Sequence, residues 1–155
     1  MYGRNLKAYK KTSIDADLAV ADPYRVIQLL YEGLLSSIAK ARFAIEKKDI
    51  ERKASEIDRA IRIVGALRAG VQYDPNNETQ RKIGENLINM YAVWNDRLIR
   101  ASAKLDVKPL DELTGYVVMV KNAWDKIPPS EREKAYEMQD ARDRAKNQNP
   151  PQGAQ

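Results

Sequence analysis

The chain has 155 residues, with neither cysteine nor histidine. The missing cysteine excludes disulfides and thiolate chemistry, and the missing histidine removes the commonest general base and metal ligand. Lysine and arginine number 27 against 22 acids, a formal charge of +5, which permits nucleic-acid or acidic-surface binding without requiring it. A chain of this length can bury one sizeable core, so a single domain is expected.

Residues 1–21 mix charges with isolated tyrosines and show no sustained helical period. We expect them to form a mobile N-terminal arm. Their start has no apolar core of signal-peptide length, and no stretch of the chain approaches a membrane span. A cytoplasmic protein without membrane insertion is therefore expected.

The first long helix is predicted over 23–47. Asp22 can cap it, and Pro23 suits its first position, where a missing N–H does no harm. Apolar residues recur at threes and fours along one face, which predicts a core-facing stripe: Val26, Ile27, Leu30, Leu34, Ile38, Ala41 and Ile45. Leu29, Leu35 and Phe43 fall off this stripe, and the second apolar side suggests a binding partner.

Three further helices follow with the same spacing. Asp49 can cap the second, Asn77 with Gln80 forms a capping-box start for the third, and Asp106 can cap the fourth. Pro109 is tolerated in the first turn of the fourth helix. The expected core stripes are Ile50, Ala54, Ile57, Ile61, Val64, Leu67 and Val71; then Ile83, Leu87, Met90 or Tyr91, Trp94, Leu98, Ala101 and Leu105; then Leu110, Leu113, Val117, Val120, Trp124 and Ile127.

This pattern predicts an all-α fold, an antiparallel up-down four-helix bundle over 22–127, because short connections make successive helices antiparallel neighbours. Residues 128–155 are rich in charge and poor in apolar residues. We expect this C-terminal extension to be marginally helical or disordered.

The sequence offers no catalytic constellation. It has no glycine-rich phosphate loop, no G-x-S-x-G and no EF-hand loop, and its helical glutamates are typical of solvated helix faces. Lys10 and Lys11 beside Tyr9 are too weak a signal for nucleic-acid binding. We therefore expect no enzyme, no metal, no cofactor and no nucleic-acid partner.

Surplus apolar residues are the remaining signal. About half of them can widen the core, and the others can form a groove for an amphipathic helix of a partner. A rival interpretation is a structural or adaptor bundle that self-associates through the same faces. The residues off the main stripes are Leu29, Leu35, Ile63, Ile88, Ile99, Val118 and Met119.

Five segments, taken in order from residue 1 to residue 127, resemble the FliS family of flagellar secretion chaperones. They are MYGRNLKAY, DPYRVIQLLYEGLLSSIAKARFAIEKKDIERK, EIDRAIRIVGALRAGV, GENLINMYAVWNDRLIRAS and LDELTGYVVMVKNAWDKI. The resemblance implies a small helical bundle that binds the disordered C-terminal segment of flagellin in the cytoplasm. It also implies that the chaperone prevents premature polymerisation and assists delivery to the export gate protein FlhA. A homodimer in the client-free state is compatible with it.

The resemblance also implies site residues. The segment from Asn86 to Tyr91 is similar to the family's NLxxLY, and the second helix supplies an apolar face. The expected flagellin-binding residues are Ile57, Ile61, Val64, Leu67, Asn86, Leu87, Tyr91 and Trp94. The alternative is that Ile57, Val64, Leu87 and Trp94 belong to the bundle core. Leu6 and Tyr9 match an arm that covers the empty groove or engages the export gate.

Overall fold

The computed structural model describes residues 23–128, 130–131, 141, 144–145 and 147–148. The expected N-terminal arm, with Leu6, Tyr9 and the cap Asp22, lies outside the described residues, as does most of the C-terminal extension. The division of the chain into arm, bundle and tail stays a prediction.

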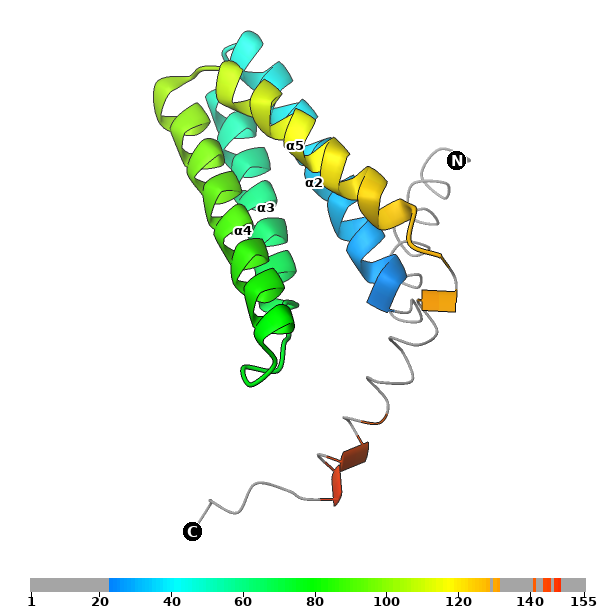
Figure 1. Cartoon of the computed structure of the whole chain (residues 1–155). Coiled ribbons are helices and arrows are strands. Elements are labelled where there is room, and N and C mark those ends of the chain that lie inside the picture. Colours follow the sequence, from blue (N-terminus) through cyan, green and yellow to red (C-terminus); the bar gives the residue numbers. More distant parts are fainter. Residues whose placement is uncertain (1–22, 129, 132–140, 142–143, 146, 149–155) are drawn as a thin grey trace, which may run out of the picture.

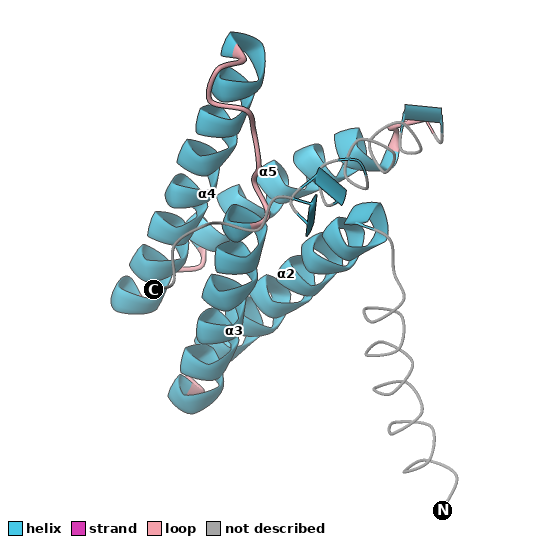
Figure 2. Ribbon diagram, turned by 90° about the horizontal axis from the view of Figure 1, so that it is seen from below, coloured by secondary structure: helices cyan, strands magenta, loops and turns pink. Residues whose placement is uncertain are grey.

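Four helices make up the bundle: α2 (Pro23–Glu46), α3 (Ile50–Ala69), α4 (Glu78–Lys104) and α5 (Lys108–Asp125). Over the described part of the chain there is no strand, and loops join the helix ends (Figure 2). Each helix runs opposite to the one before it (Figure 1). Both α2 and α4 pack against α3 and α5, so the four helices enclose one core. The predicted all-α bundle is confirmed.

Small residues bring α2 and α3 together. Ser37, Ala41 and Ala44 on α2 and Ala60 on α3 are buried. A Cβ built on Gly33 would lie 3.4 Å from the side chain of Ile63, ordinary contact distance. Small side chains reduce the distance between helix axes. The long contact between these two helices follows from that composition.

The predicted caps are confirmed in part. Asp49 accepts a hydrogen bond from the backbone N–H of Arg52 at 3.1 Å, as expected for an N-cap. Asn77 also caps α4, but the side chain of Gln80 accepts from the backbone N–H of Asp74 and does not complete a capping box. The Gln80 side chain thus bonds the N–H of Asp74 in the loop before α4 in place of the N–H of Asn77.

The predicted cap of α5 is wrong. Val107 is the N-cap residue and makes no side-chain cap, while Asp106 lies one residue earlier and accepts from the N–H of Lys108 at 3.0 Å. Pro109 does lie in the first turn, as predicted. The helix starts later because Leu105 at the end of α4 adopts a left-handed conformation (φ 51°) and turns the chain.

Ion pairs join the helices at the end of the bundle that holds the α2–α3 and α4–α5 turns, called here the closed end. Arg42 of α2 binds both carboxylate oxygens of Asp111 on α5, at 2.6 and 3.3 Å, and this guanidinium lowers the pKa of the Asp111 carboxyl. Arg97 of α4 pairs with Glu112 of α5 at 3.1 Å. These pairs are exposed, so they fix register more than they stabilise the fold.

Two helical glycines give a matched test of packing. A Cβ on Gly84 of α4 would lie 2.1 Å from the ring of Tyr73, whereas nothing lies within 4 Å of one on Gly65 of α3. We expect Gly84→Ala to destabilise the fold by about 1–3 kcal/mol through overpacking. Gly65→Ala should stabilise it by about 0.5–1 kcal/mol through helix propensity. Urea unfolding measures both, and Tyr73→Ala should rescue Gly84→Ala; equal effects of the two glycine variants would contradict the packing.

Candidate functional site

Core-facing side chains become less buried towards both ends of the bundle, and the end opposite the closed end is called here the open end. At the closed end, Ile50 and Leu105, which were expected in the core stripes, are 50% and 48% exposed. On α2, α4 and α5, a fully buried residue is followed, seven residues nearer the open end, by a half-buried one on the same face. Beside them, Val71 is half-buried just beyond the end of α3, seven residues after the buried Val64. The pairs are Leu34 and Ile27, Val64 and Val71, Trp94 and Leu87, and Val117 and Trp124. We call Ile27, Val71, Leu87 and Trp124 the open layer. Its members pack against the buried core but are themselves only half-buried.

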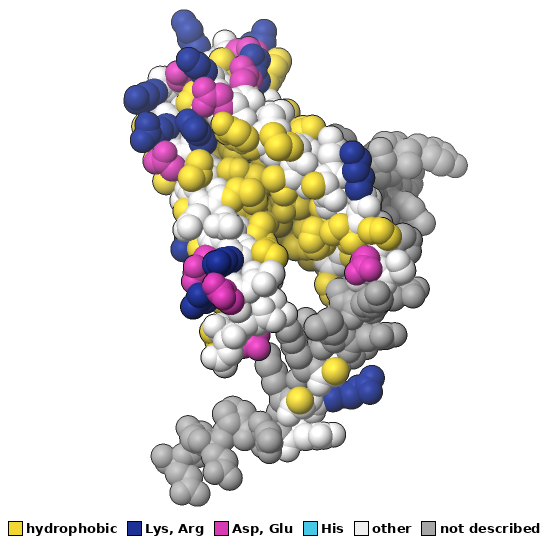
Figure 3. All heavy atoms as spheres, viewed as in Figure 1, with side chains coloured by type: hydrophobic (Ala, Val, Ile, Leu, Met, Phe, Trp, Pro, Cys, Tyr) yellow, Lys and Arg dark blue, Asp and Glu magenta, His cyan; other side chains and the backbone are white. Residues whose placement is uncertain are grey.

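Apolar side chains gather on the surface between α4 and α5, where Figure 3 shows them as one continuous patch. At the closed end this seam is bridged by Arg97 and Glu112. One heptad nearer the open end, the equivalent positions carry Met90, which is half-buried, and Met119, which is 65% exposed. Methionines adapt to irregular partners because their side chains are unbranched and polarisable.

A buried tyrosine pair lies between the complete core and the open layer. The hydroxyls of Tyr31 on α2 and Tyr91 on α4 are 2.9 Å apart, and both rings meet Trp94 edge-on. Burial raises the pKa of both hydroxyls. Nearer the open end, no hydrogen bond or ion pair between described residues joins the α2/α5 pair to the α3/α4 pair. The tyrosines are thus the last polar link before the two helix pairs separate.

Each helix pair is fastened separately at the open end. On one side, the ring of Tyr73 packs over Gly84 in the α3–α4 hairpin. On the other, the first turn of α2 and the last turn of α5 exchange hydrogen bonds: the Tyr24 hydroxyl donates to the carbonyl of Trp124 at 3.0 Å, and the Trp124 indole donates to the carbonyl of Tyr24 at 3.2 Å. The open layer lies between two walls that are each fixed internally.

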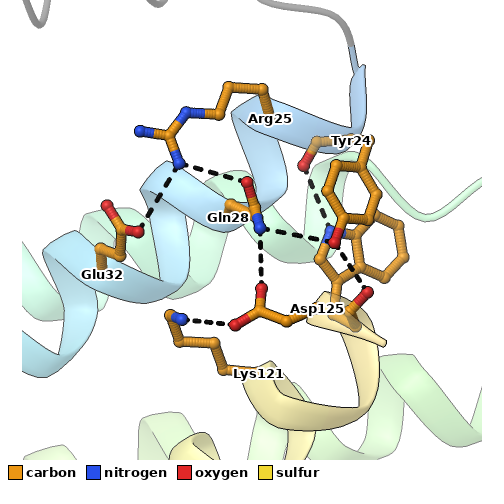
Figure 4. Close-up of polar contacts among 7 residues, drawn as sticks. Tyr24, Arg25, Gln28, Glu32, Lys121 and Asp125 are labelled. Atoms are coloured by element: carbon orange, nitrogen blue, oxygen red, sulfur yellow. Dashed lines mark hydrogen bonds and ion pairs between the residues drawn. The ribbon is translucent and has the colours of Figure 1, made fainter. Parts of the chain in front are cut away.

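A polar network extends the contact between α2 and α5 (Figure 4). Gln28 donates to one carboxylate oxygen of Asp125 at 2.8 Å, and Lys121 pairs with the other at 2.6 Å. The hydrogen bond that the Lys121 ammonium donates to Asp125 raises the pKa of that ammonium. Arg25 bonds Gln28 and lies 3.6 Å from Glu32, which orients the amide.

The residues predicted to bind flagellin divide into three groups. Five are buried in the bundle core of this structure: Ile57, Val64, Leu67, Tyr91 and Trp94. Ile61 and Leu87 are half-buried and Asn86 is exposed. Leu87 therefore lies in the open layer. Ile57, Val64 and Trp94 lie in the bundle core, as the alternative interpretation expected. A role for these residues in binding stays a prediction.

Sequence reasoning did not single out the rest of the open layer. Ile27, Val71 and Trp124 were expected only as members of the core stripes. Of the residues off the main stripes, Leu35 and Ile63 do pack against the core, whereas Ile99, Val118 and Met119 are exposed. The seven-residue repeat marks the face of a helix, but it carries no signal for the level at which the core ends.

The arrangement suits binding of an apolar helix better than it suits chemistry. Within the described residues, no three His, Cys, Asp or Glu side chains form a group that could hold a metal ion. None of the four helices is long and apolar enough to cross a membrane. An incomplete apolar layer with an adjacent methionine-bearing seam is typical of a surface that accepts an amphipathic partner helix.

Comparisons with known proteins agree with this class. The chain is 36% identical over 122 residues to flagellar secretion chaperone FliSB of Pseudomonas aeruginosa, covering 79% of this chain and 94% of that protein. It is 33% identical over 125 residues to FliS of Bacillus subtilis (81% and 86%) and 29% identical over 125 residues to FliS of Vibrio cholerae (81% and 89%). The fold and these relatives define a flagellar secretion chaperone. Residues 5–131 match the family described as Flagellar protein FliS, and the chain belongs to that family.

Alkaline pH should reveal the buried tyrosine pair. The pKa values of Tyr31 and Tyr91 are raised from 10.0 in the folded state, so the unfolded chain loses these protons first. Their contribution to stability is complete below about pH 10 and falls as pH rises further. We expect the free energy of unfolding to decline less steeply above about pH 10 in Tyr31→Phe/Tyr91→Phe than in the wild type.

Urea unfolding at a series of pH values measures this slope. Tyr116→Phe is the matched control, because Tyr116 is 42% exposed on α5. It should keep the slope of the wild type. Parallel curves for the double variant and the wild type would show that the pair does not retain its protons in the folded state.

Proposed function

We propose that this chaperone binds the disordered C-terminal segment of flagellin in the cytoplasm, prevents its premature polymerisation and assists its delivery to the export gate protein FlhA. The open layer is the observation that supports this most directly. Four core-facing positions, one on or beside each helix, are only half-buried and keep apolar surface exposed. A segment that is disordered alone can fold as an amphipathic helix against such a surface.

The size of the interaction suits a chaperone. Full burial of a large aliphatic or aromatic side chain is worth about 1.5–3 kcal/mol, so completing a half-buried position contributes on the order of 1 kcal/mol. Micromolar binding needs about 8 kcal/mol after the cost of ordering the client. The open layer alone falls short, so the client must also cover part of the α4–α5 seam, including Met90 and Met119.

Leu87 and Ile99 give a matched test on one helix. Leu87 belongs to the open layer, whereas Ile99 of α4 is 51% exposed nearer the closed end. We expect Leu87→Glu to weaken binding of a peptide covering the last forty or so residues of flagellin at least tenfold, because a carboxylate would be buried against the client. Ile99→Glu should bind as the wild type does.

Calorimetry with circular dichroism measures this binding. The wild type should bind one peptide per chain, with a gain of helix and a negative heat-capacity change. Ile61→Asp and Asn86→Ala test the predicted contact along α3 and α4, since both positions are accessible. Loss of binding in these two variants with full binding in Leu87→Glu would move the client away from the open layer.

Delivery to FlhA is proposed to involve the N-terminal arm. If Leu6 and Tyr9 engage the export gate, Leu6→Ala/Tyr9→Ala should keep the client affinity of the wild type or increase it. The same variant should lose capture of the chaperone–client complex by the soluble domain of FlhA in a pull-down. Capture equal to that of the wild type would remove the arm from this step.

A second candidate function is self-association, because a second copy of the chain could cover the same open layer. Sedimentation equilibrium of the client-free protein tests it. A dimer that Leu87→Glu abolishes and the flagellin peptide does not disturb would favour a structural or adaptor role. A monomer, or a dimer that the peptide dissociates, would favour the chaperone.

A further inference from the structure

Trp124 differs from the other members of the open layer. It is the only aromatic residue among the four, and it lies in the last turn of α5, seven residues beyond the fully buried Val117. Its face of the helix is therefore the core face, but its indole is only half-buried.

The indole of Trp124 is held in one orientation. It stacks on the ring of Tyr24 with centroids 5.3 Å apart and an interplanar angle of 13°. Its N–H, the one polar group of the side chain, donates to the Tyr24 carbonyl at 3.2 Å. Tyr24 is itself buried, at 6% exposure, and its hydroxyl returns a hydrogen bond to the Trp124 carbonyl at 3.0 Å. Both rings are thus fixed by contacts within one helix pair.

In this orientation the half-buried indole keeps part of its apolar surface exposed. Because the N–H is satisfied by α2, a client that covers the indole leaves no buried donor unpaired. Gln28 and Lys121 hold Asp125, the residue next to Trp124, so the end of α5 is also fastened. A rigid aromatic side chain loses little conformational entropy on binding, and tryptophan is enriched among residues that dominate binding energy.

We propose that Trp124 is a client-contact residue that receives an aliphatic side chain of the amphipathic client helix, and that Tyr24 is its positioning residue. The inference rests on the proposed function, since it names a recognition point for the same client. It adds to the predicted site a residue on α5, which belongs to the open layer as Leu87 of α4 does.

Tryptophan fluorescence reports on this contact directly. The chain has two tryptophans, and Trp94 is 2% exposed, so acrylamide should quench mainly Trp124. The flagellin C-terminal peptide should lower the quenching constant of the wild type at least twofold. Trp124→Ala should weaken peptide binding at least tenfold, whereas Phe43→Ala, which removes a 56% exposed aromatic residue from α2, should leave it unchanged.

The role of Tyr24 is tested through the same tryptophan. Tyr24→Leu should increase quenching of the free protein and weaken binding at least fivefold, and Tyr24→Phe, which keeps the stacked ring, should restore most of both. Because Tyr24 acts through Trp124, Tyr24→Leu should cost no further affinity in the Trp124→Ala background. Additive losses in this double-mutant cycle would overturn the positioning role. Trp124→Phe keeps an aromatic ring at this position. Its binding, measured together with urea unfolding of the variants, shows whether affinity is lost with the contact or with the fold.

The outcomes distinguish this inference from the proposed function. If the wild type does not bind the peptide at all, the proposed function fails and the role of Trp124 fails with it. If the wild type binds but acrylamide quenching is unchanged, or folded Trp124→Ala binds equally well, only the role of Trp124 is overturned.

Discussion

The structure depends on the level at which the two helix pairs stop sharing a core. Small residues such as Ala41 and Ala60 let α2 and α3 approach closely, and the buried Trp94 of α4 packs against the rings of Tyr31 and Tyr91. Nearer the open end than the Tyr31–Tyr91 hydrogen bond, the polar contacts between described residues, such as those of Tyr24 with Trp124, join helices of the same pair. The core-facing residues at that level are only half-buried.

An incomplete core lowers the stability of the free protein. Each open-layer residue keeps part of its apolar surface in water, and that surface would stabilise the fold if a fifth helix covered it. A protein needs only a few kcal/mol of net stability, so such a loss is tolerated when binding requires it. The same free energy becomes available to the client on binding. Burial of this one apolar surface can therefore contribute either to the stability of the free fold or to the affinity for a client.

The sequence predicted the fold well because its signals are local. Spacing by threes and fours located all four helices, and Asp49 and Asn77 marked two helix starts. The start of α5 was misplaced because it depends on Leu105, whose left-handed backbone is unusual for a leucine and has no local signature. Such exceptions are set by tertiary packing.

The candidate site was less predictable, for a physical reason. Val117 and Trp124 occupy equivalent positions in the repeat of α5, yet one is fully buried and the other half-buried. The difference depends on how far the α3/α4 pair has diverged from α5 at that level, which no single helix encodes. On α4, Trp94 and Leu87 also occupy equivalent positions of the repeat but differ in burial. The predicted site therefore included residues of the complete core together with a residue of the open layer.

The two sides of the groove suggest how a chaperone can be both selective and tolerant. In the proposed complex, the rigid, stacked indole of Trp124 fixes one contact and so sets the register of the client helix. The methionines of the α4–α5 seam can repack around side chains of different shape, as flexible surfaces of promiscuous binders do. Since most of the affinity comes from non-directional apolar contact, a competitor that displaces one turn of the client weakens the rest. A client held in this way is bound firmly along its length but can be released from either end.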